Sequence, residues 1–329
     1  MRMRHFWYGA AFIAVLAPAM AAADPLIPDG EIPLDGVGGR IDHLAIDLSR
    51  QRLLVAELGN NTVDIVDVAK RSRAARLTGI AEPQGVGFAS KADRYIVANA
   101  GDGTVRFYRA DDLSPVGSVS LGDDADSVRI DGKSGDVLIG YGRGGIATID
   151  PATEAKTGVV ELPAHPEAFQ LDQIGTRIYV NLPDAHRISV IDRPAGRIAA
   201  NWNTDGMSGN FPMALDEAGA RLVVIFRNPP TLVAYDIADG TVQSRVSTCG
   251  DADDVFFDAK RARIYVSCGS GGVDVFEAGA REYKHVARVV TASGARTSLF
   301  VPELDRLFVA ERAGAFGDAA AIRVFRPTP

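Results

Sequence analysis

Short apolar runs, separated by turn residues, recur along the chain at a nearly constant interval. One apolar residue beside a turn marks each interval, at Ile46, Phe88, Ile130, Leu171, Leu215, Phe257 and Val301, which are 41 to 44 residues apart. A second column starts a short apolar strand in each interval, at Arg52, Arg94, Asp136, Arg177, Arg221, Arg263 and Arg306. A repeat of this length predicts an array of similar supersecondary units.

Each interval contains four stretches that look like strands. The third alternates apolar and polar residues, as in residues 62–66 and 273–276, and the fourth is weaker, as in residues 117–121. Gly and Asn turns separate the stretches, as β-hairpins require. A helical solenoid would need apolar residues at a spacing of 3.6, and residues 24–329 lack that pattern. Four strands in about 42 residues is typical of a propeller blade, so seven intervals predict a seven-bladed β-propeller.

The two ends of the chain complement each other. The seventh repeat stops at Ile322–Phe325, its third strand, and residues 30–34 resemble the fourth strand of another blade. We therefore expect the N-terminal strand to complete the last blade and close the ring, which removes an exposed sheet edge. Residues 24–329 are predicted to be a single domain, although 329 residues would suggest two domains by length alone.

Residues 1–23 have the pattern of a secretory signal peptide. Arg2 and Arg4 precede an apolar run, and Ala21-Ala22-Ala23 forms a cleavage pattern before Asp24. The alternative is an uncleaved anchor helix, for which the run is barely long enough. We expect cleavage after Ala23, a periplasmic or secreted protein, and no membrane span in the mature chain.

Composition excludes several classes of protein. The chain has 35 basic and 42 acidic residues, a net charge of −7, and loss of Arg2 and Arg4 with the signal peptide makes it −9. That charge makes nucleic acid an unlikely partner, because binding its backbone needs a basic face. There is no CxxCH motif for haem, and the glycine pattern at 140–145 precedes a strand instead of a nucleotide-binding helix. We therefore expect neither haem nor nucleotide.

The two cysteines fall in one repeat. Cys249 precedes the first strand of the sixth repeat and Cys268 ends its second strand, so both are expected near the same face. In an oxidising compartment the pair predicts a disulfide within one blade. A thiolate metal site is the alternative, but no CxxC or neighbouring histidine accompanies the pair.

The repeated R-[IL]-[YF]-V strand followed by a Gly or Asn turn resembles the YVTN-type, YncE-like family of exported bacterial propellers. The stretches that resemble the family include residues 39–43, 165–167, 210–213, 251–254 and 295–297, and the resemblance spans essentially the whole mature chain. It implies the fold and export but no activity, because most members have none assigned. Some members are connected with single-stranded DNA, an association that the acidic charge disfavours here.

The segments that lead into the first strands should converge on one mouth of the central channel, where propeller sites are usually built. Aligning the repeats there brings together carboxylates, amides, two histidines and two arginines. The candidate ligand-binding residues are Asp42, His43, Gln84, Asp126, Glu167, Asn210, Arg227, Asp253 and Arg296.

Oxygen ligands with one or two imidazoles suit a divalent cation, and Asp126, Glu167 and Asp253 are the candidate metal ligands. Crowded carboxylates also raise one another's pKa values, which makes Glu167 a possible acid or base. His43 and His165 are candidate general bases, so the catalytic candidates are His43, His165 and Glu167. The alternative is that the acids satisfy backbone N–H groups at turns. Arg227 and Arg296 either bind an anionic ligand or neutralise neighbouring acids.

Three functions follow from this mouth. The first is binding of a small ligand or divalent cation, in a sensor or accessory protein. The second is a metal-assisted hydrolase or lactonase using the same acids. The third is a docking platform for an envelope protein.

Overall fold

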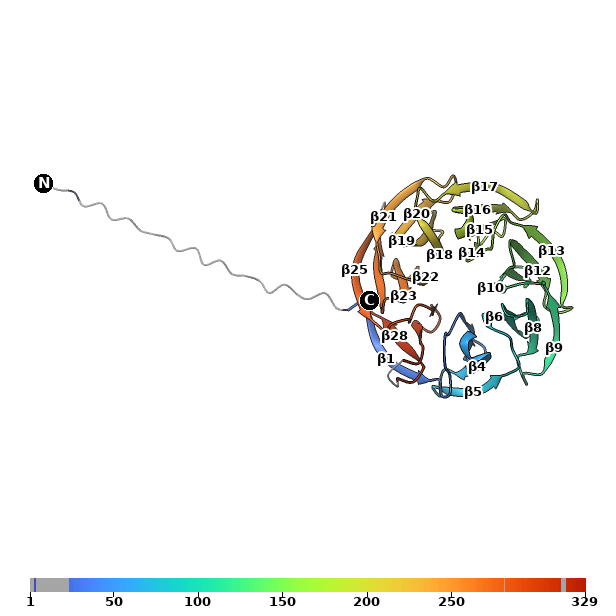
Figure 1. The fold of residues 1–329 in the computed structure, drawn as a ribbon. Helices are drawn as coiled ribbons and strands as arrows, with labels where there is room; N and C mark the ends of the chain where they lie inside the picture. The colour runs from blue at the N-terminus through green and yellow to red at the C-terminus, as the bar shows by residue number, and fades with distance from the viewer. Residues whose placement is uncertain (1–2, 4–23, 281, 315–317) are drawn as a thin grey trace.

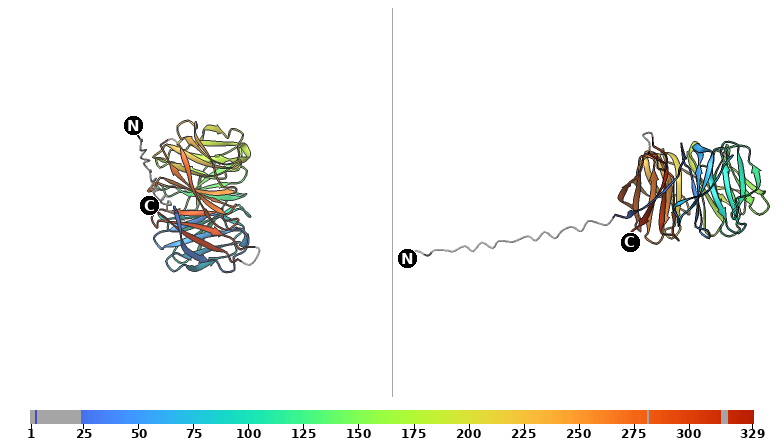
Figure 2. Two further views of the ribbon diagram at one scale, coloured as in Figure 1. Left: turned by 90° about the vertical axis from the view of Figure 1, so that its left-hand side faces the viewer. Right: turned by 90° about the horizontal axis from the view of Figure 1, so that it is seen from below.

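The computed structural model of the protein describes residue 3 and residues 24–280, 282–314 and 318–329, which form seven four-stranded antiparallel sheets. Figure 1 shows the sheets as blades around a central axis, and Figure 2 shows the ring from its side. The predicted seven-bladed, all-β propeller is confirmed. Apart from Met3, the predicted signal peptide lies outside the described residues.

Each predicted strand of the repeat has a fixed radial position. The innermost strands are β2 (Leu44–Asp47), β6 (Pro83–Ala89), β10 (Ala125–Ile130), β14 (Phe169–Leu171), β18 (Ser208–Asp216), β22 (Ala252–Asp258) and β26 (Ser298–Val301). The second strands are β3 (Arg52–Glu57), β7 (Arg94–Asn99), β11 (Val137–Tyr141), β15 (Arg177–Leu182), β19 (Arg221–Asn228), β23 (Arg263–Cys268) and β27 (Arg306–Glu311). The first column of repeating residues therefore lies in the innermost strands, and the second column starts the second strands.

The two outer positions complete the blades. The third strands are β4 (Thr62–Asp67), β8 (Thr104–Arg109), β12 (Gly145–Asp150), β16 (Arg187–Asp192), β20 (Pro230–Asp236), β24 (Gly272–Ala278) and β28 (Ala321–Pro327). The outermost strands are β5 (Ser72–Leu77), β9 (Pro115–Ser120), β13 (Ala155–Glu161), β17 (Arg197–Asn203), β21 (Val242–Ser247), β25 (Tyr283–Val290) and β1 (Leu26–Pro33). Helical structure in the described residues is limited to two 3₁₀ turns, η1 (Leu58–Asn60) and η2 (Pro183–Ala185), and none of it is long and apolar enough to cross a membrane.

Ring closure follows the prediction. β1 pairs antiparallel with β28, so the N-terminal strand becomes the outer edge of the blade that the C-terminal residues build. The strand is longer than residues 30–34, and its register shifts between Pro28 and Glu31. β1 and β28 thus lie side by side in one sheet, and the last blade has no missing strand.

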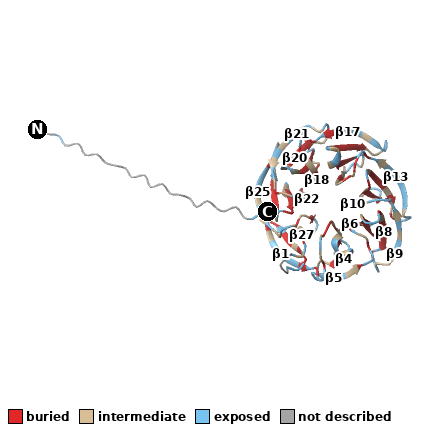
Figure 3. Ribbon diagram, viewed as in Figure 1, coloured by how far each residue is buried: buried red, intermediate tan, exposed pale blue. Residues whose placement is uncertain are grey.

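The hydrophobic core lies between neighbouring blades. Val55 of blade 1 and Phe308 of blade 7 share one buried cluster, and Tyr95 of blade 2 packs with Leu54 of blade 1 in another. The second strands are almost fully buried, whereas exposed residues gather along the outermost strands (Figure 3). Burial on both faces explains why the second strands are continuous apolar runs and the outer strands are not.

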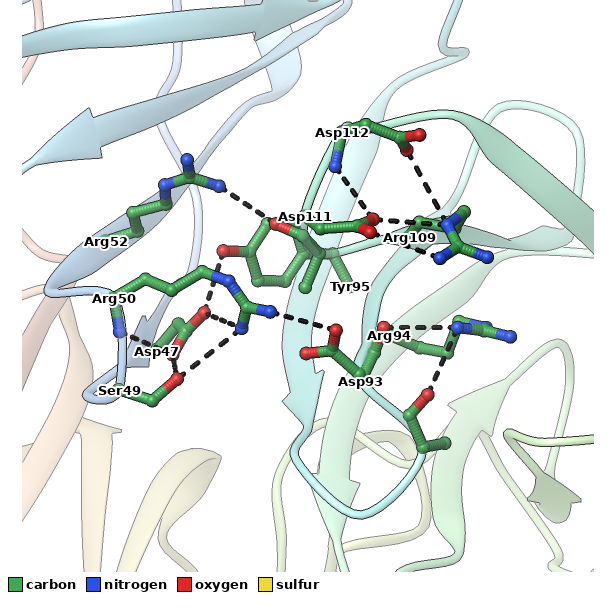
Figure 4. A network of polar contacts seen from close by, with 12 residues as sticks. Asp47, Ser49, Arg50, Arg52, Asp93, Arg94, Tyr95, Arg109, Asp111 and Asp112 are labelled. Atoms are coloured by element: carbon green, nitrogen blue, oxygen red, sulfur yellow. Dashed lines mark hydrogen bonds and ion pairs between the residues drawn. The ribbon is translucent and has the colours of Figure 1, made fainter.

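Buried polar contacts join neighbouring blades at the C-terminal end of the innermost strand, where Asp47 is the last residue of β2. Asp47 accepts hydrogen bonds from the Tyr95 hydroxyl at 2.9 Å, from the Arg50 main-chain N–H at 3.1 Å and from the Arg50 guanidinium at 3.0 Å (Figure 4). Arg50 also reaches Asp93 of blade 2 at 2.9 Å. Burial disfavours the charged carboxylate, but a hydrogen bond from the Ser49 hydroxyl, together with those from Tyr95 and Arg50, outweighs it and lowers the pKa of Asp47.

The cysteines form the predicted bond. Cys249 and Cys268 are joined by a disulfide within blade 6, with Cα atoms 5.9 Å apart. The glycine-rich stretch at 140–145 joins β11 to β12 as a hairpin, as predicted.

Candidate functional site

The predicted column of acids does converge at one mouth of the channel. Asp42 is fully buried at the N-terminal end of blade 1, and the charges of Asp126 in blade 3 and Asp253 in blade 6 both act on it. Burial raises the pKa of Asp42 to about 7; His43 and Arg40 oppose the rise, and Asp126 and Asp253 add to it. Acids from opposite sides of the ring thus share one electrostatic environment.

Three residues from blades 3 and 4 form a compact set of metal-ligating groups. One ligand atom each of Asp126, His165 and Glu167 lies within 4.8 Å of the others. Asp126 is the second residue of β10, the inner strand of blade 3, and the other two residues lie in the segment that leads into blade 4. The Ser127 hydroxyl donates to the Glu167 carbonyl at 2.7 Å, which holds the two segments together.

A hydrogen bond at Nδ1 orients the His165 ring. Nδ1 lies 2.6 Å from the carbonyl oxygen of Gly142, which makes Nδ1 the N–H donor, and Nε2 lies 3.6 Å from an oxygen of Asp126. Burial works against a charged imidazole, but Asp126 and the Gly142 carbonyl outweigh it and raise the pKa of His165 to about 9. A hydrogen bond from the remote nitrogen to a carbonyl is the usual support of a metal-bound histidine.

The Asp126 carboxylate of this set lacks a partner, and the Glu167 carboxyl group lies close to other acids. Asp126 is only 7% exposed, and its Oδ1 is buried without a hydrogen-bond partner among the described residues. Burial raises the pKa of Glu167 to about 8, with a contribution from Asp126 and Asp253 against His165 and Arg227. A cation placed among these oxygens would remove both the repulsion and the missing contact.

The third predicted metal ligand, Asp253, is held by arginines. Arg227 of blade 5 contacts one of its oxygens, and Nε of Arg296 lies 3.0 Å from the other. The Arg227 guanidinium also stacks 3.6 Å from the Phe211 ring centroid, and Nη1 of Arg296 reaches Asp251 at 3.0 Å. Of the two roles predicted for these arginines, the neutralising role is the one the contacts display.

His43 is half-buried and faces two carboxylates. Its ring nitrogens are 3.8 Å from Asp42 and 3.7 Å from Asp254. Burial opposes protonation, but Asp254 first, and then Asp42 and Asp126, outweigh it and raise the pKa of His43 to about 10. The residue is therefore an imidazolium at neutral pH, in the role of a counter-ion.

A central cavity of about 420 Å³ lies along the innermost strands beside His43. Asp254, Arg129 and Gln170 contribute polar groups to it, and apolar side chains such as Phe256 line the remainder. The innermost strands of blades 2 and 3 approach each other closely beside this cavity, because a Cβ at Gly85 would lie 1.9 Å from the carbonyl oxygen of Asp126.

The two amide candidates are used within the protein. Gln84 donates to Asp124 at 3.2 Å. Asn210 is fully buried and donates to Asn181 at 3.3 Å and to the carbonyl of Arg187 at 3.0 Å. Their contacts join neighbouring blades.

Sequence reasoning did not select several residues that the structure brings to the mouth. The Gly142 carbonyl, Arg129 and Arg312 contact or line the site. A main-chain carbonyl carries no signal in a sequence. Arg312 directly follows Glu311, which ends a second strand at this face, so that position could have drawn attention to it.

Comparison with known proteins supports the fold. No family model matches the chain, and no curated protein matches it. Among solved structures, hydrazine synthase of Kuenenia stuttgartiensis is similar, at 16% identity and a TM-score of 0.76 over 90% of this chain and 98% of that chain. A chain of a mitotic checkpoint complex is similar at 10% identity and a TM-score of 0.77, over the whole of both chains. The protein is a seven-bladed β-propeller, and at these identities the likeness extends to the fold alone.

Proposed function

We propose that this protein binds a divalent cation at the mouth of its central channel, through Asp126, His165 and Glu167. The observation that carries the proposal is the meeting of three ligand atoms within 4.8 Å, one of them from a buried carboxylate with an unpartnered oxygen. The hydrogen bond between His165 Nδ1 and Gly142 adds to it, because it leaves Nε2 to face the acids.

Two carboxylates and one imidazole suit a borderline divalent ion such as Mn²⁺ or Zn²⁺ better than a soft ion, which prefers thiolates. Three protein ligands leave coordination positions for water or a small ligand. The set is also consistent with a proton on His165 that a bound cation would replace.

We place this activity in the periplasm of a bacterium, as a binding or accessory protein of the YVTN type. The signal-peptide pattern of residues 1–23 and the repeated strand motif support this placement. The Cys249–Cys268 disulfide also supports it, since such bonds persist in oxidising compartments.

The test is calorimetric titration of the mature, metal-free protein with Mn²⁺, Zn²⁺ and Ca²⁺. We expect about one ion per chain for at least one of them. Glu167→Gln and His165→Gln should each weaken binding by more than about 100-fold, because even loss of an outer-shell partner costs about 10- to 100-fold.

Two controls decide which acids bind. Asp184→Asn removes the same charge from an exposed position in η2, at the same face of blade 4, and should leave affinity unchanged. Asp253→Asn separates the set found in the structure from the set predicted by sequence. Equal losses in Glu167→Gln and Asp184→Asn, or no stoichiometric ion at all, would contradict the proposal.

A metal-assisted hydrolase or lactonase is the second candidate. Two carboxyl groups of raised pKa, the buried Asp42 and the half-buried Glu167, favour it, because groups that titrate near neutral pH suit proton transfer. In this mechanism the cation would polarise a carbonyl oxygen, and Asp42 would serve as the base in preference to the charged His43. Turnover of esters or lactones that persists after complete metal removal would exclude it.

A docking platform is the third candidate. The propeller fold is compatible with it, but the exposed large apolar residues are spread over five blades, at Leu48, Val116, Val159, Ile174, Val286 and Val290. A docking face would gather such residues into one patch. Co-purification of an envelope protein at fixed stoichiometry is the test.

A further inference from the structure

A second polar pocket lies at the channel face between blades 6, 7 and 1. It has a volume of about 270 Å³, and its charged lining consists of Arg40, Arg296, Arg312 and Asp251. Arg40 leads into blade 1, Arg296 leads into blade 7, and Arg312 follows the second strand of blade 7. Three guanidinium groups from three separate segments therefore face one carboxylate across a small space.

The acids of the mouth occupy only part of this donor capacity. Arg40 contacts Asp42 through Nη2 at 2.7 Å, while its Nε is buried without a hydrogen-bond partner in the described part of the chain. Arg296 uses Nη1 for Asp251 and Nε for Asp253. Each guanidinium has five N–H donors, so both arginines keep donors that no acid satisfies.

Arg312 differs from Arg40 and Arg296, because it does not neutralise a neighbouring acid among the described residues. It makes no ion pair with any residue that the structure describes, and its exposed side chain lies over the turn at Gly294. Gly294 has a φ of +85°, and a Cβ there would lie 2.5 Å from Nε of Arg312. The turn thus combines a left-handed backbone with the absence of a side chain, which leaves room for the guanidinium against the pocket.

We infer that this pocket binds the carboxylate or phosphate group of a small anionic ligand through Arg40, Arg296 and Arg312. The planar fork of arginine matches both groups, and convergent guanidinium groups with free donors are the usual way to hold them. The pocket uses none of the three residues proposed to bind the cation, so anion binding and cation binding can be tested independently. They lie near each other, because Arg296 holds Asp253, whose charge acts on Glu167.

The experiment uses mature, metal-free protein from which the chelator, itself a polycarboxylate, has been removed by desalting. Inorganic phosphate and malonate are titrated in parallel at low ionic strength. We expect saturable binding of at least one of them, and the tighter of the two identifies the anionic group. Arg312→Gln and Arg40→Gln should each weaken binding by at least about tenfold, the loss of one charge-assisted contact.

Arg143→Gln is the matched control. Arg143 is an exposed arginine in the hairpin between β11 and β12, on the same face but outside the pocket. It should bind like the wild type. Equal weakening by Arg143→Gln would mean nonspecific attraction and would overturn the inference. Anion binding that appears only with a divalent cation present and disappears in Glu167→Gln would place the anion on the metal, which also overturns it. Absence of saturable binding of either anion has the same consequence.

Discussion

Removal of the Asp47 carboxylate tests whether buried polar contacts between blades stabilise the ring. Asp47 is fully buried and accepts hydrogen bonds from Tyr95 of the neighbouring blade and from Arg50 (Figure 4). In Asp47→Ala the buried Tyr95 hydroxyl and the Arg50 main-chain N–H lose their acceptor. The Arg50 guanidinium is partly exposed and keeps Asp93, so its own loss is small.

The magnitude follows from these two orphaned donors. Each buried unsatisfied group costs about 1–3 kcal/mol, so the loss of an acceptor for two such donors should lower the free energy of unfolding by about 2–6 kcal/mol in Asp47→Ala. Unfolding entropy is about 2 cal/mol/K per residue, so for a domain of roughly 300 residues each kcal/mol lowers Tm by about 1.6 °C. The expected decrease in Tm is therefore about 3–10 °C.

Differential scanning calorimetry at neutral pH is the assay, and Asp111→Ala is the control. Asp111 pairs with Arg109 at 3.1 Å in the same region, but both side chains are about half exposed, so we expect no measurable change (Figure 4). The Tm difference between wild type and Asp47→Ala should shrink in acid, since a lowered pKa gives stability that is lost as the pH falls through the folded-state value. Equal decreases in both variants would refute the reasoning.

Three further predictions concern other parts of the ring. Replacing both Cys249 and Cys268 by serine removes a cross-link with a sequence separation of 19, so the free energy of unfolding should fall by about 3 kcal/mol and Tm by about 5 °C. The melting curves are recorded without reductant, and an unchanged Tm would contradict this prediction. Burial raises the pKa of Glu57 to about 8, so the stability that its protonated form contributes declines as the pH rises from about 4.5 to about 8. The decrease in Tm between pH 5 and pH 8 should therefore be smaller in Glu57→Gln than in wild type, and equal decreases would argue against this. Gly85→Ala should weaken the proposed cation binding by at least about tenfold in titrations of folded protein, because the new Cβ would displace the Asp126 main chain. An affinity equal to that of the wild type would show that the site tolerates the shift.

The candidate site was predictable in its place and its residue types. The column of acids at 42, 126, 167 and 253 could be aligned because the repeat puts equivalent residues at one mouth. Their pairing could not be predicted. Asp253 sits between Arg227 and Arg296, whereas His165 joins Asp126 and Glu167. Repeat alignment gives the blade and the height of a residue in the ring, but it does not give the direction of a side chain.

The sequence by itself determined the number of blades, the order of strands in each blade, the closure by the N-terminal strand and the disulfide. The number of blades and the order of strands depend on local alternation, turn residues and a repeat of fixed length. The closure follows from a strand that the last repeat lacks and the N-terminal segment offers, and the disulfide follows from two cysteines placed near one face of a blade in an oxidising compartment. Only the tertiary structure decided which charges meet across the ring, that a carbonyl of Gly142 orients His165, and that Arg312 faces Arg40. Those contacts join residues from different blades, so they depend on distances that no local pattern encodes.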